Sequence, residues 1–553
     1  MDIMNELSFL NWVVTSKEMQ SIDKTAQEYW GLSGAVLMEN AGAAIASHLI
    51  AAFDGHCFKT VVMAGTGNNG GDGFVIARHL HSRGFPVQVV IFGSRDRVQG
   101  HALTNLRILE LSSVDVQVFS DHNRGGIQIA LGQADVVIDA LLGTGITGTV
   151  RGDVAAGIDL INEAGDAEQL GLPSTSAIKG AFSPLIVAVD IPSGIDGTSG
   201  QVWGKAVSAD ITFILGLAKR GLFLHPEAGH VGELVLKGIS LLPEQLEATG
   251  LKGQLITARV AASSIPKRPS QGHKGTFGRV LIVGGSEGMS GAPALTAISA
   301  LRTGAGLVYL GVPEGLGPVV DALALEAIGV LLEGDASGCL GLGSADEILK
   351  FLSDNTVSVL ALGPGLGRGM SLSQAVPRIL ATVSCPIVLD ADGLNAVARN
   401  QDQVAATFNS ISSELIVTPH PGEMGRLLNL SAAEVDNNRI EVALSAAQDW
   451  QCIVVLKGAP TVVALANGSY FINTSGNSVL ATAGSGDVLS GVICGLIAQG
   501  ATPTDAAIGA VYAHGLAGDI WREEKGCRGL LAHELADTIT RALNRLTQER
   551  FEV

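Results

Sequence analysis

The first half of the chain alternates short apolar runs with stretches of helical periodicity. Four apolar runs bounded by Gly, Asp or Pro are predicted to be buried strands: Phe58–Ala64, Pro86–Phe92, Ala134–Ala140 and Leu185–Asp190. The stretch Asp72–Gly84 has the spacing of a helix. Strands that alternate with helices in this way predict a mainly parallel sheet with helices on both faces.

The second half restarts this alternation after a break. Residues 241–270 accumulate Pro, Ser, Lys and Arg and lose the strand pattern, so we predict two domains, over residues 1–250 and 251–553. A helix is predicted over Ala292–Thr303 and a β-rich patch over Thr461–Asn473. The predicted strands of this half are Arg279–Val283, Leu307–Gly311, Val357–Leu362, Pro386–Leu389, Glu414–Thr418 and Cys452–Leu456. Residues 164–183, rich in Gly, Ser, Thr and Pro, are predicted to be a surface insertion.

Composition fits two aliphatic cores in a chain of 553 residues. Hydrophobic residues make up 47% of the chain and aromatic residues only 4%. The net charge of -18 disfavours nucleic-acid binding, which needs a basic face. Mean hydropathy is +0.35, yet no uncharged apolar run reaches the roughly 18–20 residues of a membrane span. The longest such run, Val488–Gln499, is predicted to be a buried helix.

The cysteines and the first residues predict a cytoplasmic location. The chain starts Met-Asp-Ile-Met-Asn-Glu, which lacks the basic region of a secretory signal. The six cysteines show no CxxC spacing, and most lie among apolar residues. We therefore expect buried free thiols in a reducing compartment.

Most predicted strands of the second half end in a glycine-rich or polar motif. These motifs are Gly284–Gly288, Gly363–Gly367, Leu389–Gly393, Thr418–Glu423 and Leu456–Thr461. The carboxyl ends of the strands form the ligand crevice of an open α/β sheet. This edge is therefore predicted to be a site.

The most informative stretch is Leu480–Gly491, which reads LATAGSGDVLSG. Small residues precede an aspartate and a long apolar helix, so the backbone N–H groups can bind an anion where the helix dipole favours negative charge. Asp487 would then stand where a base deprotonates an attacking hydroxyl. The structural alternative is an ordinary N-cap, with Asp487 bonding the first turn of the helix.

Other residues of this edge carry the same pair of interpretations. His420, between two prolines, can be a rigid loop residue, and Lys457 can be a solvated lysine at a strand end. At least one of Asp390 and Asp392 is expected to cap the following helix. In a site, Lys457 would supply charge to a nucleotide, and Glu423 would help to hold hydrated Mg²⁺ through water.

Together these motifs resemble the ribokinase-like superfamily, and more narrowly its ADP/ATP-dependent NAD(P)H-hydrate dehydratase branch, over about residues 255–553. The resemblance implies a ribokinase-like α/β fold, Asp487 as the catalytic base, Mg²⁺ as cofactor and ADP or ATP as co-substrate. It implies hydrate contacts at Ala292, Gly365 and His420. It implies nucleotide contacts at Lys457, Gly458, Ala459, Pro460, Thr461, Gly484, Ser485 and Gly486.

In the first half, Gly65–Gly73 follows a strand and opens a helix, as dinucleotide-binding loops do. The next strand ends Ile91–Arg95 without the acidic residue that would bind a ribose, which disfavours a conventional NAD dehydrogenase. Two amide side chains, Asn68 and Asn69, lie at the tip of the loop.

Two later strand ends begin with a carboxylate, Asp139 and Asp190. Asn69, Asp139 and Ser193 offer hard oxygen ligands that suit a monovalent or a hard divalent cation. The structural alternative for an aspartate here is helix capping, which we expect for Asp196 and not for Asp190.

With Met38–Gly42 upstream, these motifs resemble the NAD(P)H-hydrate epimerase family over about residues 10–245. The resemblance implies a Rossmann-like, parallel, three-layer domain, K⁺ held by Asn69, Asp139 and Ser193, and Asp190 as the acid/base. It implies substrate contacts at Asn68, Asn69, Gly70, Gly71, Asp72, Gly143, Thr144, Gly145, Ile146, Thr147, Gly148 and Thr149.

The two resemblances in one chain imply repair of hydrated NADH and NADPH. The first domain would interconvert the R and S hydrates as an isomerase, and the second would dehydrate the S form as a lyase. They also imply small-molecule partners only, no membrane, and a homo-oligomer such as a tetramer. Two alternatives stay open: a kinase of the same superfamily whose product stays phosphorylated, and a first half that is a regulatory module or an interaction scaffold.

Overall fold

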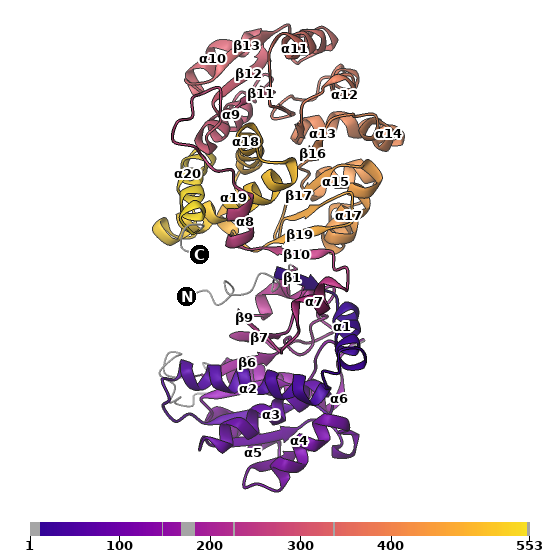
Figure 1. The fold of residues 1–553 in the computed structure, drawn as a ribbon, viewed down its shortest axis with the longest axis vertical. Helices are drawn as coiled ribbons and strands as arrows, with labels where there is room; N and C mark the ends of the chain where they lie inside the picture. Colours follow the sequence, from indigo (N-terminus) through magenta and orange to yellow (C-terminus); the bar gives the residue numbers. More distant parts are fainter. Residues whose placement is uncertain (1–10, 146–147, 167–182, 225–226, 336–337, 550–553) are drawn as a thin grey trace. The chain divides into compact units, whose positions relative to one another are not determined.

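The computed structural model describes residues 11–145, 148–166, 183–224, 227–335 and 338–549. The chain divides into two compact units, Met1–Leu251 and Lys252–Val553 (Figure 1). Most of the insertion predicted over residues 164–183 lies outside the described residues. Both units are α/β structures with mainly parallel sheets, so the predicted fold class is confirmed.

The first unit is built on a parallel sheet of order β4-β3-β2-β5-β6-β7-β9. The chain adds β3 and β4 on one side of β2 and the later strands on the other, so the strand order reverses between β2 and β5, where ligands bind in such sheets. The strands are β2 (Thr60–Ala64), β3 (Val87–Ile91), β4 (Asp115–Val118), β5 (Val136–Ala140), β6 (Leu185–Val189), β7 (Ile211–Leu215) and β9 (Glu233–Lys237). A short parallel pair joins β1 (Trp12–Val14) to β8 (Ala218–Lys219).

Helices cover both faces of this sheet. Successive residues of β2 point to opposite sides, so Val62 joins one hydrophobic cluster while Val61 and Met63 join the other. The first cluster is covered by α1 (Ser16–Glu28), α2 (Gly34–Ala52), α3 (Asn68–Ser82), α4 (Gly100–Glu110) and α7 (Pro243–Glu247), and the second by α5 (Arg124–Gly132) and α6 (Gly152–Gly165).

The second unit has the strand order β13-β12-β11-β14-β15-β16-β17-β18-β19-β10, parallel except where β18 pairs with β17 and β19. Figure 1 shows α8, α9, α18, α19 and α20 on one side of the strands and α11 to α15 with α17 on the other. The strands are β10 (Gly253–Ile256), β11 (Arg279–Val283), β12 (Leu307–Pro313), β13 (Ile328–Leu332), β14 (Val359–Leu362), β15 (Ile387–Leu389), β16 (Leu415–Val417), β17 (Ile453–Leu456), β18 (Val462–Ala464) and β19 (Tyr470–Asn473). The helices are α8 (Ala258–Ser264), α9 (Gly291–Thr303), α10 (Gly317–Leu323), α11 (Leu342–Asp354), α12 (Leu372–Thr382), α13 (Ala391–Ala398), α14 (Val404–Asn409), α15 (Pro421–Leu428), α16 (Ala432–Asn437), α17 (Arg439–Trp450), α18 (Ser485–Ala498), α19 (Pro503–Lys525) and α20 (Ala532–Glu549).

Two glycines let α18 pack directly on α9. A Cβ on Gly491 would overlap Thr296 O, and a Cβ on Gly495 would lie 2.6 Å from Thr303 Cβ. Because no side chain fits between the helices at these positions, their backbones lie in close contact. This contact fixes where α18 begins, which matters for the site below.

Three expectations need correction. Residues 241–270 were expected to lack strands but contain β10, which pairs in parallel with β19. The helix predicted over Asp72–Gly84 begins at Asn68. All six thiols are free as expected, but Cys57 and Cys527 are exposed rather than buried, since they lie in surface segments next to charged residues.

One described helix, α2, is long and apolar enough to cross a membrane by length and composition. It was missed because Glu39 interrupts its apolar run. The apolar side chains Leu37, Ile45 and Leu49 are buried in the core of the first unit. Glu39 pairs with Arg78 and lies 2.7 Å from His79 of α3, so α2 has the contacts of a core helix.

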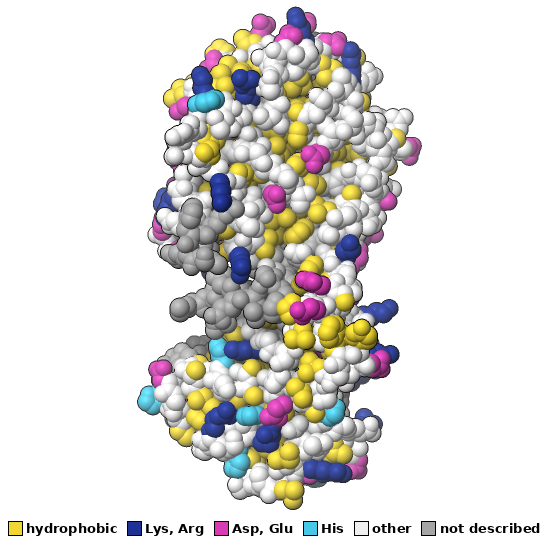
Figure 2. All heavy atoms as spheres, in the orientation of Figure 1, with side chains coloured by type: hydrophobic (Ala, Val, Ile, Leu, Met, Phe, Trp, Pro, Cys, Tyr) yellow, Lys and Arg dark blue, Asp and Glu magenta, His cyan; other side chains and the backbone are white. Residues whose placement is uncertain are grey.

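The surface carries mixed charge. On the face of the described residues shown in Figure 2, Lys and Arg side chains are scattered among acidic ones and form no continuous basic patch.

Two candidate active sites

In the first unit, glycines bring three backbone segments together at the switch point. A Cβ on Gly65 would overlap Leu141 O, and a Cβ on Gly70 would overlap Gly65 O. A Cβ on Gly73 would lie 2.8 Å from Ala140 Cβ. The loop after β2, the start of α3 and the loop after β5 can therefore lie backbone against backbone.

The three predicted cation ligands, Asn69, Asp139 and Ser193, form one buried hydrogen-bonded cluster. Asp139 accepts from Ser193 Oγ at 2.6 Å and from Ser193 N at 2.7 Å. Leu142 N donates to Ser193 Oγ at 2.8 Å, and Asn69 Nδ2 donates to Leu142 O at 2.8 Å. Asp139 and Ser193 are 0% exposed and Asn69 is 8% exposed. Burial raises the pKa of Asp139 to about 6, although the bonds from Ser193 lower it.

This oxygen set could hold a weakly hydrated monovalent cation. It combines a single carboxylate with amide, hydroxyl and backbone carbonyl oxygens, whereas divalent ions usually attract more carboxylates. Within the described ranges, no group of three or more His, Cys, Asp or Glu side chains is arranged to hold a metal ion.

Asp190 follows β6 with a left-handed backbone, φ +67°. Such a conformation is costly for a non-glycine residue and persists only where its surroundings enforce it. Its carboxylate accepts from Lys219 Nζ and, at 3.2 Å, from Leu215 N. Lys219 is 1% exposed and also donates to Leu215 O at 2.8 Å. A buried ion pair therefore holds the predicted acid/base carboxylate in place.

A cavity of about 600 Å³ joins these features. Asp190 and Lys219 line it together with six of the predicted substrate contacts, namely Asn68, Asn69, Asp72, Gly143, Thr144 and Gly145. Burial, with Asp190 nearby, raises the pKa of Asp72 well above its usual range, which favours the protonated carboxyl.

Other predicted contacts of the first site lie elsewhere. A Cβ on Gly71 would lie 2.5 Å from Met38 Cε, so this glycine serves close packing, as Gly70 does. Thr149 lies beside Gly204, and neither Gly148 nor Thr149 lines the cavity. Ile146 and Thr147 lie outside the described residues.

Asp196 has a structural role, but in a turn rather than at a helix. Its carboxylate accepts from Thr198 N at 2.8 Å and Ser199 N at 2.7 Å. The helix cap expected for Asp196 is thus wrong because the chain turns here without entering a helix.

In the second unit, α18 begins at Ser485 and its N-cap is Gly484, with φ +87°. A Cβ on Gly484 would lie 2.9 Å from both Ala532 Cβ and Leu295 Cδ1, so only glycine fits. Asp487 is the third residue of the helix and not its N-cap. The interpretation of Asp487 as an ordinary N-cap is therefore wrong. Because the N-cap has no side chain, the N–H groups of the first turn face outward without a side-chain cap, as in anion-binding helix ends.

Lys457 lies at the centre of a charged network beside this helix end. Its Nζ donates to Asp390 Oδ1 at 2.7 Å and lies 3.9 Å from Glu423 Oε2. A Cβ on Gly486 would be 3.2 Å from Lys457 Nζ, so the ammonium adjoins the glycine loop. Burial lowers the pKa of Lys457, but Asp390 and Glu423 outweigh it and the pKa is raised, so the lysine stays charged.

Asp487 is the group in this network whose protonation is poised near neutrality. Burial, followed by the nearby charge of Asp390, raises its pKa to about 7, while Lys457 lowers it. A carboxylate with such a pKa can take a proton from a hydroxyl near neutral pH.

The predicted hydrate contacts lie on neighbouring strand ends. A Cβ on Gly365 would lie 3.2 Å from Ala292 Cβ, so these two residues are adjacent. His420 is the N-cap of α15, and its Nδ1 accepts from Gly422 N at 3.0 Å. Glu423 accepts from His420 N at 2.9 Å. Burial, with Lys457 nearby, lowers the pKa of His420, which favours the neutral ring.

Asp390 caps α13 by accepting from Ala391 N at 2.8 Å, as expected for one of the two aspartates. Asp392 instead accepts from Gly367 N at 2.9 Å. Of the other nucleotide-binding candidates, Thr461 Oγ1 donates to Gly458 O at 3.2 Å, and the Ala459–Pro460 peptide bond is cis.

Three side chains that support this site were not predicted. Ser490 Oγ donates to Asp390 Oδ2 at 2.7 Å, and its position three residues after Asp487 was the one available signal. His514 Nε2 lies 3.0 Å from Ser485 O, and burial lowers its pKa to about 4. Arg439 donates to Lys457 O at 3.0 Å and occupies the space that a side chain at Gly458 would need. Neither His514 nor Arg439 stands in a recognisable motif.

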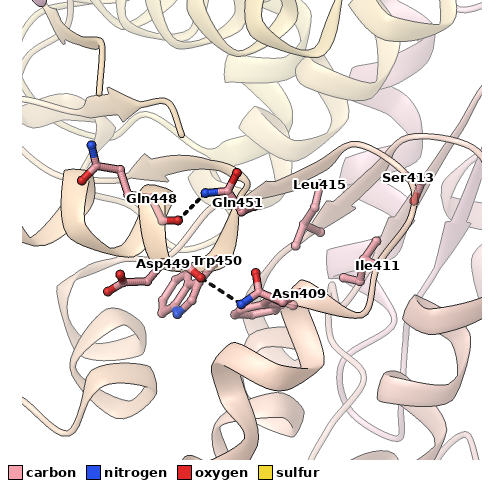
Figure 3. A pocket seen from close by; sticks show the side chains of 9 residues that line it. Asn409, Ile411, Ser413, Leu415, Gln448, Asp449, Trp450 and Gln451 are labelled. Atoms are coloured by element: carbon pink, nitrogen blue, oxygen red, sulfur yellow. Dashed lines mark hydrogen bonds between the residues drawn. The ribbon is translucent and has the colours of Figure 1, made fainter. Parts of the chain in front are cut away.

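A separate hollow of about 540 Å³ lies elsewhere on the second unit. Figure 3 shows Asn409 bonded to the backbone of Asp449, and Gln451 bonded to that of Gln448, along its wall. Leu415, the first residue of β16, lines this hollow, whereas Thr418 and the motif after it follow the other end of that strand. The hollow therefore lies at the amino ends of the strands, away from the site.

The two sites lie at the carboxyl ends of the strands, one site in each unit. Together they define a two-domain α/β enzyme with one glycine-loop site and one site suited to phosphoryl transfer. Residues 34–221 match the sequence profile of the family described as YjeF-related protein N-terminus, and residues 280–541 match NAD(P)H-hydrate dehydratase. The bifunctional NAD(P)H-hydrate repair enzyme of Moorella thermoacetica is 38% identical over 542 residues, covering 97% of this chain and 98% of that protein. The chain belongs to the family of bifunctional NAD(P)H-hydrate repair enzymes, as its motifs predicted.

Two further relatives match this chain, one over almost its whole length and the other over about half of it. The repair enzyme of Thermofilum pendens is 36% identical over 537 residues, covering 97% of each chain. The ADP/ATP-dependent NAD(P)H-hydrate dehydratase of Bacillus subtilis, co-crystallised with ATP and Mg²⁺, is 33% identical and covers 53% of this chain and 98% of that one, with a TM-score of 0.47.

Proposed function

We propose that this chain repairs hydrated NADH and NADPH, with epimerisation in the first unit and ADP- or ATP-driven dehydration of the S hydrate in the second. The observation that carries the proposal is Asp487, a half-buried carboxylate whose pKa is raised to about 7, beside an uncapped helix N-terminus and a charged lysine. The hydrate carries a hydroxyl on the carbon beside the ring nitrogen, which is a poor leaving group until it is activated.

In the second unit, Asp487 would take the hydroxyl proton while the oxygen attacks the terminal phosphoryl group of ADP or ATP. The backbone N–H groups of Gly484, Ser485 and Gly486, with Lys457, would stabilise the charge on that group. The ring nitrogen's lone pair then expels phosphate, and loss of a proton from the next carbon restores the dihydronicotinamide. Mg²⁺ bound with the nucleotide would neutralise phosphate charge, and Glu423 would hold it through water.

In the first unit, the same lone pair allows hydroxide to leave and water to return on the other face of the ring. Asp190, held by Lys219, would transfer the proton. K⁺ would be held by Asn69, Asp139 and Ser193 and would neutralise part of the negative charge beside the substrate. Both epimers of the hydrate would then become available for dehydration.

The direct test supplies purified S hydrate of NADH with ADP or ATP and follows the absorbance of reduced nicotinamide. We expect NADH to return only when nucleotide is present, with release of one phosphate per NADH formed. A kinase of the same superfamily would instead leave a phosphorylated product and no NADH. That result would overturn the proposal.

The oxygen cluster predicts a K⁺-dependent epimerisation. Replacing K⁺ by a large organic cation should lower conversion of the R to the S hydrate about tenfold, the range seen when metal sites are disturbed. Ser193→Ala should raise the K⁺ concentration needed for half of the maximal rate. A rate that is independent of K⁺ in both proteins would refute the assignment.

A homo-oligomer in the cytoplasm, with a tetramer as one form, stays a prediction. The exposed free thiols of Cys57 and Cys527 favour a reducing compartment. Sedimentation of the purified protein tests the oligomer, and a monomer would contradict it.

A further inference from the structure

Asp23 on α1 faces the first cavity, and the mechanism above leaves it without a role. It lines the same cavity as Asp190 and Lys219. Its Oδ1 is buried and has no hydrogen-bond partner among the described residues. A buried carboxyl oxygen without a partner is costly unless a ligand or a proton occupies it.

The charges around this cavity do not balance. Lys219 is the one ammonium group that faces the three carboxyl groups of Asp23, Asp72 and Asp190 among the described lining residues, and it is already paired with Asp190. The other polar side chains of the described wall are one histidine, His101, and the uncharged side chains of Gln20, Gln27, Thr66, Asn68, Asn69 and Thr144. One ammonium cannot offset three carboxylates in a partly dehydrated space, so protons must be retained on this cluster.

The two remaining carboxyl groups differ in how readily they exchange a proton. Burial, with Asp190 nearby, raises the pKa of Asp72 well above its ordinary value. Burial also raises the pKa of Asp23, with Asp190 adding and Lys219 opposing, but only to about 6. Asp23 can therefore both give and accept a proton under working conditions.

Epimerisation through loss and return of water needs both an acid and a base. The departing hydroxyl must receive a proton, and the returning water must lose one on the other face of the ring. In the reverse direction the two groups exchange roles. Asp190 can fill one of these roles at a time.

We propose that Asp23 is the second acid–base residue of the first site, an inference that rests on the proposed epimerase function. In one direction, the Asp23 carboxyl protonates the hydroxyl, the C–O bond breaks, water leaves, and the ring nitrogen's lone pair forms a C=N bond. Water then attacks the same carbon from the opposite face, Asp190 accepts its proton, and the C=N electrons return to nitrogen. In the reverse reaction, Asp190 is the acid and Asp23 the base, so atoms and charge balance in both directions.

The test compares the full chain with its Asp23→Asn variant. The substrate is R hydrate without ADP or ATP, so the second unit does not consume the product, and chromatography separates the epimers. After subtraction of the spontaneous rate, we expect at least about a hundredfold loss of epimerisation, the range of a lost acid–base group. The pH profile should lose one of its two limbs, and Asp23→Glu, which keeps the carboxyl group, should recover part of the rate and both limbs. Glu28→Gln is the matched control, because Glu28 lies on the same helix with a side chain 69% exposed.

Each outcome separates this inference from the function on which it rests. If the unaltered chain interconverts the hydrates and Asp23→Asn keeps its rate and both pH limbs, the role of Asp23 is overturned while the epimerase function stands. If the unaltered chain does not interconvert them, the epimerase function fails and this inference fails with it. The melting curve of the variant monitors folding of the first unit, because dehydration of S hydrate takes place in the second unit. If Asp23→Asn unfolds, Asp23→Glu decides: both pH limbs at a reduced rate support the role of Asp23, and a rate equal to that of the unaltered chain overturns it.

Discussion

Asp487→Asn is expected to lower ADP- or ATP-dependent recovery of NADH from the S hydrate by about a thousandfold, within the range for a lost general base. Asn preserves the shape of the side chain but cannot accept the hydroxyl proton. The nucleotide should still bind, because Lys457 and the backbone of the glycine loop are unchanged. The measurement is the initial rate of absorbance recovery at saturating hydrate and nucleotide.

The pH dependence provides an independent check on the same residue. Since the base must be ionised and its pKa is raised to about 7, the rate of the unaltered chain should fall as pH drops below about 7. Any residual rate of Asp487→Asn should lack this fall. A variant with an unchanged rate, or one that keeps the same pH limb, would show that another group is the base.

Loss of folding would not explain this result. The raised pKa means that ionising Asp487 costs stability as pH rises from its ordinary value of 3.8 toward about 7, because the unfolded chain releases the proton more readily. Asn removes that cost, so the melting temperature at pH 7 should stay the same or rise. Asp402→Asn, at an exposed position of the same unit, is the matched control and should change neither property.

Asp190→Asn should bring conversion of the R to the S hydrate close to its spontaneous rate, a loss of about a hundredfold or more. The S hydrate should still be dehydrated normally, because Asp487 lies in the other unit. The measurement is the recovery of NADH from each separated epimer with ADP present. It tests whether epimerisation and dehydration are carried out by different units. Equal loss for both epimers would contradict it.

The choice of Asn separates chemistry from backbone strain. Asn tolerates the left-handed conformation that Asp190 adopts. Loss of the carboxylate leaves Lys219 buried without its ion-pair partner, which costs about 3–5 kcal/mol in comparable cases, so the melting temperature should be reported beside the rate. Asp54→Asn is the matched control, since Asp54 has φ +50° on an exposed turn.

The sequence was sufficient to predict a candidate site in each unit because several of the chemically informative residues follow strands. Asp190, Lys457 and the loop that starts at Gly65 each come directly after an apolar run, and parallel strands bring such positions to one edge. The family resemblance then assigned roles to these residues. Strand positions were also predictable because buried strands read as continuous apolar runs.

The supporting residues could not be found in this way. Lys219 and Asp23 reach the first cavity from β8 and α1, far along the chain from Asp190 and outside any motif. His514 is brought to Ser485 by the packing of α19 against α18. The strand β10 was missed because four residues carry little pattern, and its pairing with β19 depends on residues more than 200 positions away.

The direct contact of α18 with α9 has a consequence for how the second site acquires its geometry. The helix α9 begins with Gly291 and Ala292 at the expected substrate wall, and α18 begins with the loop that carries Asp487. With glycines at the contact, the two helices form a single rigid body inside the hydrophobic core. The separation between the base and the substrate wall is therefore set when the protein folds, and binding of the nucleotide has only to deliver the phosphoryl group to a spacing that already exists.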